Sequence, residues 1–504
     1  MSIGGKSPLT GGVKEANAGG TAGDALGVLG VKAIVVENQP QGEHWYTLLI
    51  HEDLSAELIQ LDELKGLGTY ATSESLQEKF GEDCCVISIG QAGEQMLRGA
   101  GIAVTGIHDQ RSNHAARGGL GALMGSKRLK AVVVEKAKPK KALSNPDLFR
   151  DARRKFASEL INSPKLGRKG SQHLYGTASI IGAVNEMGSL PTRGFSSGKF
   201  EAAETLRGEF MRKTILERGG KIGTRCMPGC VIACRNVYVD QDGEPIVGTL
   251  QYETIALVGS NLGFGSLDDV AHLNYLCNDY GVDTIEMGAA LGVAVEAGLA
   301  EFGDFPSIIA LLEQVAKGTE TGKMIGNGAV ATGDKLGIKR VPAALGQAMP
   351  GYDPRSLKGN GVTYATSPQG ADHTAGNAFG ARNEVNPFSI FRQKDLSLKL
   401  QIIAAMLDST GLCLFARPPI IANPQWMVDM INGIYGWGWT VEDYHQFNQD
   451  VLRMELEFNH RAGITAADYR IPSWMQEEPL PPHQVVFDVP DSDLDDVFIP
   501  LFMS

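Results

Sequence analysis

The sequence has few cysteines and no excess of basic residues, and each shortage excludes a class of protein. Seven cysteines in 504 residues are an odd, sparse set that does not form the disulfide framework of a small secreted domain. Lysine and arginine total 46 against 58 acidic residues, a net charge of −12. This balance argues against binding to nucleic acid or an anionic membrane, because phosphate binding needs a basic face. Small molecules and other proteins are therefore the expected partners.

Long apolar runs are also missing. No stretch approaches the 18 or so apolar residues of a membrane-spanning helix. The first residues, MSIGGKSPLTGG, lack the apolar core of a signal peptide. We therefore expect a cytoplasmic protein without a membrane span. In a reducing compartment, clustered thiols more often bind metal or carry out redox chemistry than form disulfides.

Glycine, in contrast, is abundant at 62 residues, well above the usual share of about 7%. Much of the backbone must turn tightly or approach something closely, which indicates a large buried ligand. The chain is also too long for one hydrophobic core, and its length predicts two to four domains.

Short β-branched runs separated by glycine-rich turns predict a β-rich first domain over residues 1–141. The expected strands are residues 31–37, 45–51, 85–89 and 129–135. The domain ends in KAKPKKALSNPD (136–147), which has the composition of a linker.

Beyond this linker, apolar residues recur at three- and four-residue steps, the helical period. Helices are expected over residues 145–161, 269–281, 288–303 and 307–318. A second stretch rich in proline and glycine, 341–356, divides the helical part into domains 142–344 and 345–504. The predicted fold class is α+β, with a β-rich domain followed by two mostly helical ones.

One weak internal repeat crosses that second break. NDYGVD (278–283) and DSTGLC (408–413) each follow a helical pattern and share a glycine, an aliphatic residue and a final potential ligand. A common role and chance explain six residues equally well at this stage.

Three cysteines lie within nine residues, CMPGCVIAC, at positions 226, 230 and 234. Pro228 and Gly229 disfavour a regular helix, so we expect a loop that closes into one helical turn. Three converging thiolates are soft ligands suited to zinc or to an iron-sulfur cluster.

Three interpretations of these thiols remain open from the residues alone. They could be small buried apolar side chains. Structural zinc usually takes paired Cys-x2-Cys or histidine ligands, and neither is near. A cluster needs a fourth ligand from afar or leaves one iron open. Cys84 and Cys85 lie in a strand pattern and Cys277 in a helical one, whereas Cys413 follows a glycine that allows close backbone approach. Cys413 is therefore the best fourth candidate.

Two glycine-rich stretches, 7–30 and 117–130, could supply backbone amides for phosphate, with Lys127 or Lys130 near the second. Ordinary tight turns between strands explain them as well. The second stretch does not match Gly-x-Gly-x2-Gly after a strand, which argues against a dinucleotide-binding fold.

Taken together, these residues resemble the aldehyde ferredoxin oxidoreductase family, the tungsten-pterin enzymes. The resemblance rests on collinear motifs along the chain: SPLTG (7–11), ANAGG (16–20), IGQAGEQ (89–95), RGGLGALMGSKRLKA (117–131), LPTRGF (190–195), the cysteine cluster, YETIALVGSNLG (252–263), CNDYGVDTI (277–285), YDPRSLKGNGVTYATSPQGADH (352–373), DSTGLCLF (408–415) and EPLPPH (478–483). It implies a first domain that forms the base for a bis-pterin cofactor, closed over by two helical domains.

The resemblance also implies particular site residues. A 4Fe-4S cluster would be held by Cys226, Cys230, Cys234 and Cys413. Two pterins, binding one tungsten or molybdenum atom, would be held by the loops that contain Asp283, Asp408 and Leu412. The pterin phosphates and a bridging magnesium would lie against Asn17, Gly19, Gly20, His114, Ala115, Arg117, Gly118 and Gly119.

The family's candidate acid/base pair falls on Glu253 and His373. A carboxylate whose pKa is raised by burial can accept the proton released in aldehyde oxidation, and a histidine can polarise the carbonyl. Without the resemblance, Glu253 would be interpreted as a helix-start or surface carboxylate and His373 as a satisfied loop histidine.

The implied function is oxidation of an aldehyde to a carboxylic acid, with electrons leaving through the cluster to ferredoxin or an iron-sulfur partner subunit. A second copy of the chain is a further possible partner. Reduction of an activated aromatic thioester, or a truncated non-catalytic iron-sulfur protein, are the alternatives. The chain departs from the family in its Cys-x3-Cys spacing, where Cys-x2-Cys is usual. The resemblance also leads us to expect about 70 further N-terminal residues, with an arginine between pterin and cluster; a start assigned too late, a separate chain or a real loss would each explain their absence here. The family's arginine ahead of the alanines in SNHAARGG is absent too.

Overall fold

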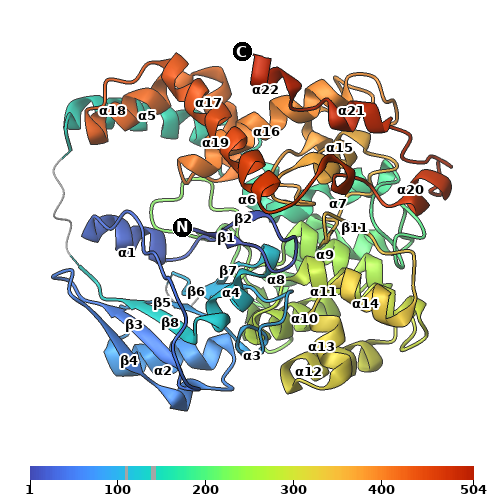
Figure 1. Ribbon diagram of the computed structural model, residues 1–504, viewed down its shortest axis with the longest axis horizontal. Coiled ribbons are helices and arrows are strands. Elements are labelled where there is room, and N and C mark those ends of the chain that lie inside the picture. The colour runs from blue at the N-terminus through green and yellow to red at the C-terminus, as the bar shows by residue number, and fades with distance from the viewer. Residues whose placement is uncertain (108–111, 138–142, 504) are drawn as a thin grey trace.

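The computed structural model describes residues 1–107, 112–137 and 143–503. Part of the predicted linker, residues 138–142, lies outside the described residues. Figure 1 shows the sheet of the first domain at one corner of the molecule and the helices stacked beside and above it.

Six strands form the main sheet of the first domain, in the order β4-β3-β8-β5-β6-β7. Their bounds are β3 Tyr46–Ile50, β4 Ala56–Gln60, β5 Cys85–Ser88, β6 Ile102–Val104, β7 Asn113–Ala115 and β8 Leu129–Val134. Strands β3 and β8 are parallel, and the other neighbours are antiparallel.

Both faces of this sheet are covered, which explains its near-continuous apolar strands. In β8, Ala131 and Val133 join one apolar cluster with Leu76 of α2 (Thr69–Phe80), whereas Val132 and Val134 join another. That second face is covered by α1 (Ala22–Leu29), α4 (Leu120–Ser126) and the hairpin of β1 (Ser2–Lys6) and β2 (Val13–Asn17). The alternation follows from side chains pointing to opposite faces along a strand.

The rest of the chain is mostly helical. Its longer helices are α5 Pro146–Asn162, α8 Gly208–Glu217, α10 Leu267–Tyr280, α11 Thr284–Glu296, α12 Phe305–Lys317, α14 Ala329–Leu336, α15 Lys358–Thr366, α16 Gln393–Ser409, α18 Pro424–Tyr435 and α19 Val441–Arg461. The shorter ones are α3 Gln91–Glu94, α6 Ser171–Tyr175, α7 Ile181–Glu186, α9 Tyr252–Leu257, α13 Glu320–Gly326, α17 Arg417–Ala422, α20 Ser473–Glu477, α21 Asp491–Asp495 and α22 Ile499–Met503. Two small hairpins complete it, β9 Tyr238–Val239 with β10 Pro245–Val247 and β11 Ala343–Ala344 with β12 Gln347–Ala348.

Helix α11 is the centre of the largest core, because every residue from Ile285 to Val295 is buried. This core draws apolar side chains from both predicted helical domains, and their boundary at residue 344 stays a prediction. A separate apolar cluster joins α5, α17 and α18 to the cysteine loop. In Figure 1, α5 and α18 lie side by side at the edge of the molecule.

Most sequence-predicted elements are confirmed within a few residues. Three of the predicted strands are β3, β5 and β8, and the predicted helices at 145–161, 269–281 and 307–318 are α5, α10 and α12. The helix predicted at 288–303 instead runs from Thr284, after the Asp283 cap, to Glu296. It ends there because Gly298 adopts a positive φ of 83°.

The strand predicted at residues 31–37 is wrong. No regular structure forms there, and the side chain of Val35 is 77% exposed. The β-branched composition favours an extended chain, but no described strand pairs with this segment, so composition alone does not make it a strand.

Among the described residues, no single helix has the length and apolar character needed to cross a membrane. Only the bent pair Gln393–Ser409 and Leu414–Ala422, with 111° between its halves, meets the criteria jointly.

A buried ion pair offers a test of the first domain. Lys130 Nζ lies 2.5 Å from Glu94 Oε1, and the lysine side chain is fully buried. Lys130→Met should lower the free energy of unfolding by about 3–5 kcal/mol, because it leaves a mostly buried carboxylate without its cation. Urea unfolding measures this. Lys136→Met, which removes a surface pair with Asp83, is the matched control and should change stability little; equal effects of the two variants would contradict the prediction.

Candidate active site

The predicted acid/base residues meet in the structure. Glu253 lies in the first turn of α9, and its Oε1 is 3.4 Å from His373 Nε2. Its Oε2 accepts a 2.5 Å hydrogen bond from the Gly351 N–H, whereas Oε1 and His373 Nδ1 are buried atoms that find no hydrogen-bond partner among the described residues. Burial raises the pKa of Glu253, against the opposing charge of His373. Glu253 is therefore a buried carboxyl with one oxygen still able to accept a proton.

Two buried ion pairs surround this acid/base pair. Arg117 Nε donates to Asp283 at 3.2 Å, and its two terminal nitrogens donate to the Ala371 and Ala348 carbonyls at 2.6 Å each. Lys14 Nζ pairs with Asp372 at 2.7 Å. Burial alone would raise the pKa of Asp372, but the charges of Lys14 and Arg117 bring it well below its usual value.

The glycines predicted to lie near the pterin phosphates allow close backbone approach. Gly118 has φ 79°, and a Cβ there would come within 2.2 Å of the Lys14 side chain. Gly20 has φ 95°, and its N–H donates to the Cys226 carbonyl at 2.6 Å. Neighbouring Gly19 also lies against Cys226, and Gly119 lies against the Arg98 carbonyl. These glycines therefore join the first domain to the ion pairs and to the cysteine loop.

Strand β7 carries two further predicted residues. Ala115 is buried and pairs with Ile102. His114 Nε2 lies 2.9 Å from Ser112 Oγ, and burial together with the charge of Arg235 lowers the pKa of His114 to about 4. His114 is therefore neutral at pH 7 and can take part in hydrogen bonds but carries no positive charge.

The two loops of the weak repeat have the same turn. Gly281 and Gly411 both adopt positive φ, 73° and 68°. The Val282 N–H donates to the carbonyl of Cys277, five residues back, and the Leu412 N–H donates likewise to Leu407. The shared glycine-aliphatic pattern therefore has a structural basis in a helix-terminating turn.

The acidic residues of the two loops differ in their surroundings. Asp283 caps α11 and is paired with Arg117. Asp408 accepts a 3.2 Å hydrogen bond from Asn17 and, among the described residues, forms no ion pair, although the charge of Lys14 partly lowers its pKa. Burial and the nearby charges of Glu15, Asp372 and Glu455 raise the pKa of Asp408 to about 8.

The cysteine loop does not close into the helical turn expected from sequence. Pro228 and Gly229, with φ 76° at the glycine, occupy the tip where the turn would need regular backbone. Cys230 accepts a hydrogen bond from the Cys226 thiol, which lowers the pKa of Cys230. Burial and the charges of Cys413 and Cys230 raise the pKa of Cys234 to about 12.

Each of the four predicted thiols therefore influences the pKa of at least one of the others. Among the residues that the structure describes, however, no three histidine, cysteine or acidic side chains are grouped closely enough to hold one metal ion. Cys413 also accepts from the Phe415 N–H at 3.4 Å, which fixes the turn that carries it.

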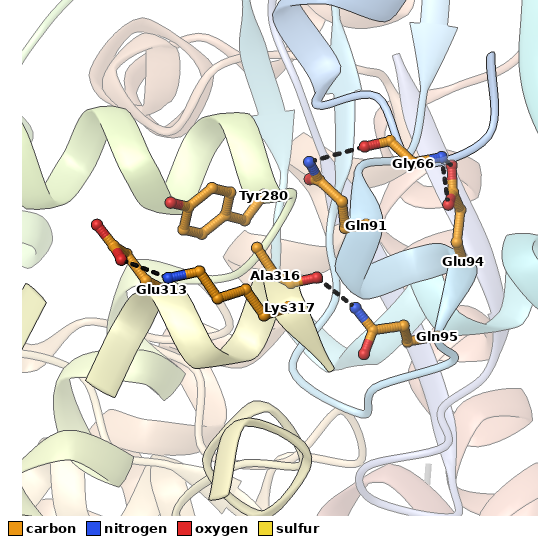
Figure 2. Close-up of a pocket in the computed structure, with 8 residues that line it drawn as sticks. All are labelled: Gly66, Gln91, Glu94, Gln95, Tyr280, Glu313, Ala316 and Lys317. Atoms are coloured by element: carbon orange, nitrogen blue, oxygen red, sulfur yellow. Dashed lines mark hydrogen bonds and ion pairs between the residues drawn. The ribbon is translucent and has the colours of Figure 1, made fainter. Parts of the chain in front are cut away.

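An open recess of about 490 Å³ lies elsewhere, between α3, α10 and α12. Figure 2 shows that Gln91 donates to the Gly66 carbonyl and Gln95 to the Ala316 carbonyl in its lining, and that the Lys317–Glu313 pair lies within α12. It contains none of the predicted site residues.

Three residues of the site were not predicted from the sequence. Lys14 and Asp372 are charged residues whose spacing in the sequence matches no recognisable motif. Glu286 is a fully buried acid in the apolar helix α11, and it accepts the Ala329 and Ala348 N–H groups at 2.9 Å each. Burial raises the pKa of Glu286 to about 7. The available signal was an acidic residue, Glu286, directly before an otherwise apolar helical run.

A buried acid/base pair and a set of four interacting thiols in one chain are typical of a redox enzyme. Comparison with known proteins supports the same class of enzyme. The description "Aldehyde ferredoxin oxidoreductase, N-terminal domain" matches residues 1–136, and "Aldehyde ferredoxin oxidoreductase, domains 2 & 3" matches residues 151–497. The chain belongs to the aldehyde ferredoxin oxidoreductase family, and it is an oxidoreductase of that family.

Curated relatives include tungsten-containing aldehyde ferredoxin oxidoreductases from Pyrococcus abyssi and Thermococcus kodakarensis. Each is 31% identical over 502 residues, covering 94% of this chain and 79% of the relative. An aliphatic sulfonate oxidoreductase WOR-like subunit from Pyrococcus furiosus is 24% identical over 481 residues, covering 88% of this chain and 71% of the relative.

A solved structure, the active site complex BamBC of benzoyl coenzyme A reductase with 1,5-dienoyl-CoA, has the same fold. The TM-score is 0.78 at 17% identity, covering 99% of this chain and 83% of that one. At this identity the likeness concerns the fold alone.

Asp408 makes the site sensitive to pH. Its folded-state pKa of about 8 lies above its ordinary value near 3.8, so the folded protein holds this proton more tightly than the unfolded chain. Ionising this buried carboxyl destabilises the folded protein. The destabilisation is absent below pH 4, grows between pH 4 and pH 8, and reaches its full size above pH 8. Asp408→Asn, which keeps an acceptor for Asn17, should therefore become more stable relative to the native chain as pH rises across that window. Thermal unfolding at pH 4.5, 6 and 8.5 measures this; a constant difference would refute it.

Proposed function

We propose that the protein oxidises an aldehyde to a carboxylic acid at a tungsten- or molybdenum-bis-pterin centre, with electrons leaving through a 4Fe-4S cluster. The observation that carries the proposal is the buried Glu253–His373 pair, whose Oε1 and Nδ1 lack hydrogen-bond partners. The names of the relatives, tungsten-containing aldehyde ferredoxin oxidoreductases, support the same reaction.

The residues present fit these cofactors. Cys226, Cys230, Cys234 and Cys413 would hold the cluster, since the other three thiols all act on the pKa of Cys226. The turns at Gly281 and Gly411 would each hold one pterin, with Asp283, Asp408 and Leu412 as contacts. The phosphates, with a bridging magnesium, would lie against the residues of the first domain, namely Asn17, Gly19, Gly20, His114, Ala115, Arg117, Gly118 and Gly119. When bound, the metal centre accepts the two electrons of the oxidation.

The protein side chains would accept the released proton and polarise the substrate carbonyl. An aldehyde and one water yield the acid, two protons and two electrons. His373 donates a hydrogen bond to the carbonyl oxygen and makes the carbon more electrophilic. Glu253 Oε1 accepts the proton released as the water-derived oxygen adds, because burial has raised its affinity for protons. The Gly351 N–H holds the other carboxylate oxygen and so fixes the direction of Oε1.

The electron path follows from the loop after α16. Asp408 lies at the end of α16 and Cys413 follows the turn at Gly411, so a pterin contact and a cluster ligand would be only a few residues apart. Electrons would leave from the cluster to ferredoxin or to an iron-sulfur partner subunit.

Glu253→Gln tests the acid/base role. The amide keeps the size of the side chain but cannot accept the proton, so aldehyde-dependent reduction of a viologen dye under anoxic conditions should fall by about 10²–10⁴-fold. Glu301→Gln, at an exposed turn, is the control and should retain activity. Full activity in Glu253→Gln would remove this residue from the mechanism.

Cys413→Ser tests the fourth thiol. Serine is a poorer ligand for iron, so the iron content per chain and the viologen activity should both fall well below those of the native chain. Cys277→Ala alters a buried thiol outside the quartet, and this control should keep its iron. Unchanged iron in Cys413→Ser would exclude it as a cluster ligand.

A further inference from the structure

Glu286 is an acidic side chain in α11, where every residue from Ile285 to Val295 is buried. Both of its carboxylate oxygens accept backbone hydrogen bonds, Oε1 from the Ala329 N–H and Oε2 from the Ala348 N–H, at 2.9 Å each. Burying an ionisable group costs free energy that an apolar side chain at the same position would not cost. The role of Glu286 is therefore to be found in the two backbone groups that it holds.

The first of these groups fixes Glu286 to the start of α14. Ala329 is the first residue of that helix, and Gly328 before it has φ 96°. A Cβ on Gly328 would lie 2.5 Å from Glu286 Oε1, too close for any larger residue, so the glycine leaves the space that the carboxylate occupies. A carboxylate is also favoured at the start of a helix, where backbone N–H groups lack partners within the helix. Oε1 is thus anchored, and Oε2 can hold the Ala348 N–H in a fixed place.

The second group belongs to a segment that leads to Glu253. Three residues after Ala348, the Gly351 N–H donates to Glu253 Oε2 at 2.5 Å. The Gly351 carbonyl accepts a hydrogen bond from the Tyr252 hydroxyl. Pro350 stands directly before Gly351 and restricts the backbone between the two N–H groups. The position of the N–H that directs Glu253 therefore depends on where Ala348 is held.

Ala348 also leads to His373. Its carbonyl accepts a hydrogen bond from Arg117 Nη2 at 2.6 Å, and Arg117 Nη1 donates to the Ala371 carbonyl, also at 2.6 Å. Ala371 lies two residues before His373. Buried backbone polar groups need such partners, and the N–H and the carbonyl of Ala348 find theirs in Glu286 and Arg117. A shift of Ala348 would therefore reach both members of the acid/base pair.

We infer that Glu286 is a positioning residue for the Glu253–His373 pair. It holds the Ala348 peptide, which continues to the N–H that directs one member of the pair and supports the other member through Arg117. This inference rests on the proposed aldehyde oxidation and adds a residue to the machinery of the same site. A displacement of about 1 Å in a reacting group can slow a reaction about 10²-fold, so a hydrogen bond made away from the substrate has a measurable effect.

Glu286→Gln tests this role in the anoxic holoenzyme. The amide keeps the size of the side chain, but it offers one acceptor oxygen instead of two and turns an NH2 group toward a backbone N–H. The viologen-linked kcat per bound tungsten or molybdenum should fall about tenfold or more, because the reacting groups are displaced. KM should change less than about threefold, because substrate binding is not altered.

Glu94→Gln is the matched control. The Glu94 carboxylate also accepts a backbone N–H, that of Gly66, at 3.0 and 2.9 Å from its two oxygens. This variant loses a comparable buried carboxylate in the first domain and should keep its kcat per bound metal.

Hydrogen exchange followed by mass spectrometry gives a readout that does not depend on turnover. In Glu286→Gln, the Ala348 and Gly351 amides should both exchange about tenfold or more faster than in the native chain, because a buried amide opens more readily once its anchor is weakened. In Glu94→Gln, both amides should exchange as in the native chain.

Unchanged kcat per bound metal in Glu286→Gln, or faster exchange at Ala348 with native exchange at Gly351, would overturn the inference. If the native protein oxidises no aldehyde, the proposed function fails, and exchange at the two amides alone decides the role of Glu286. If Glu286→Gln does not fold, Glu286→Asp takes its place. It keeps both oxygens on a side chain shorter by one methylene, so both amides should again exchange faster, and native exchange at both would overturn the inference.

Discussion

Two buried ion pairs fix the relative positions of the segments that form the site. Arg117–Asp283 and Lys14–Asp372 connect the first domain to the start of α11 and to the loop that carries His373. Removing one partner from such a pair costs about 3–5 kcal/mol, because a buried charge is left uncompensated. The position of His373 beside Glu253 therefore depends on contacts made between segments hundreds of residues apart.

The sheet and the long helices could be predicted from sequence because apolar period and capping residues are local signals. Asp283 and Ser266, for example, both cap helices as their residue types suggest. The segment 31–37 was mispredicted because strand formation needs a neighbouring strand, which composition does not reveal.

The site was predictable where residue type and spacing coincide. Three cysteines in nine residues indicated a thiol site and a preceding glycine favoured Cys413 as the fourth, whereas the pairing of Glu253 with His373 came from resemblance to a family. Lys14 and Asp372 escaped prediction, because they come together only through tertiary packing. The turns at Gly281 and Gly411 are the opposite case. Their shared sequence pattern was weak, yet both adopt the same backbone conformation and hydrogen bond.

The central claim is that the four thiols and the two turns hold an iron-sulfur cluster and a bis-pterin metal centre in one chain. Elemental analysis of protein purified under anoxic conditions tests it most directly. The account predicts about four irons and one tungsten or molybdenum per chain, the stoichiometry of one 4Fe-4S cluster and one metal centre. Zinc in place of iron, or iron without the heavier metal, would contradict it.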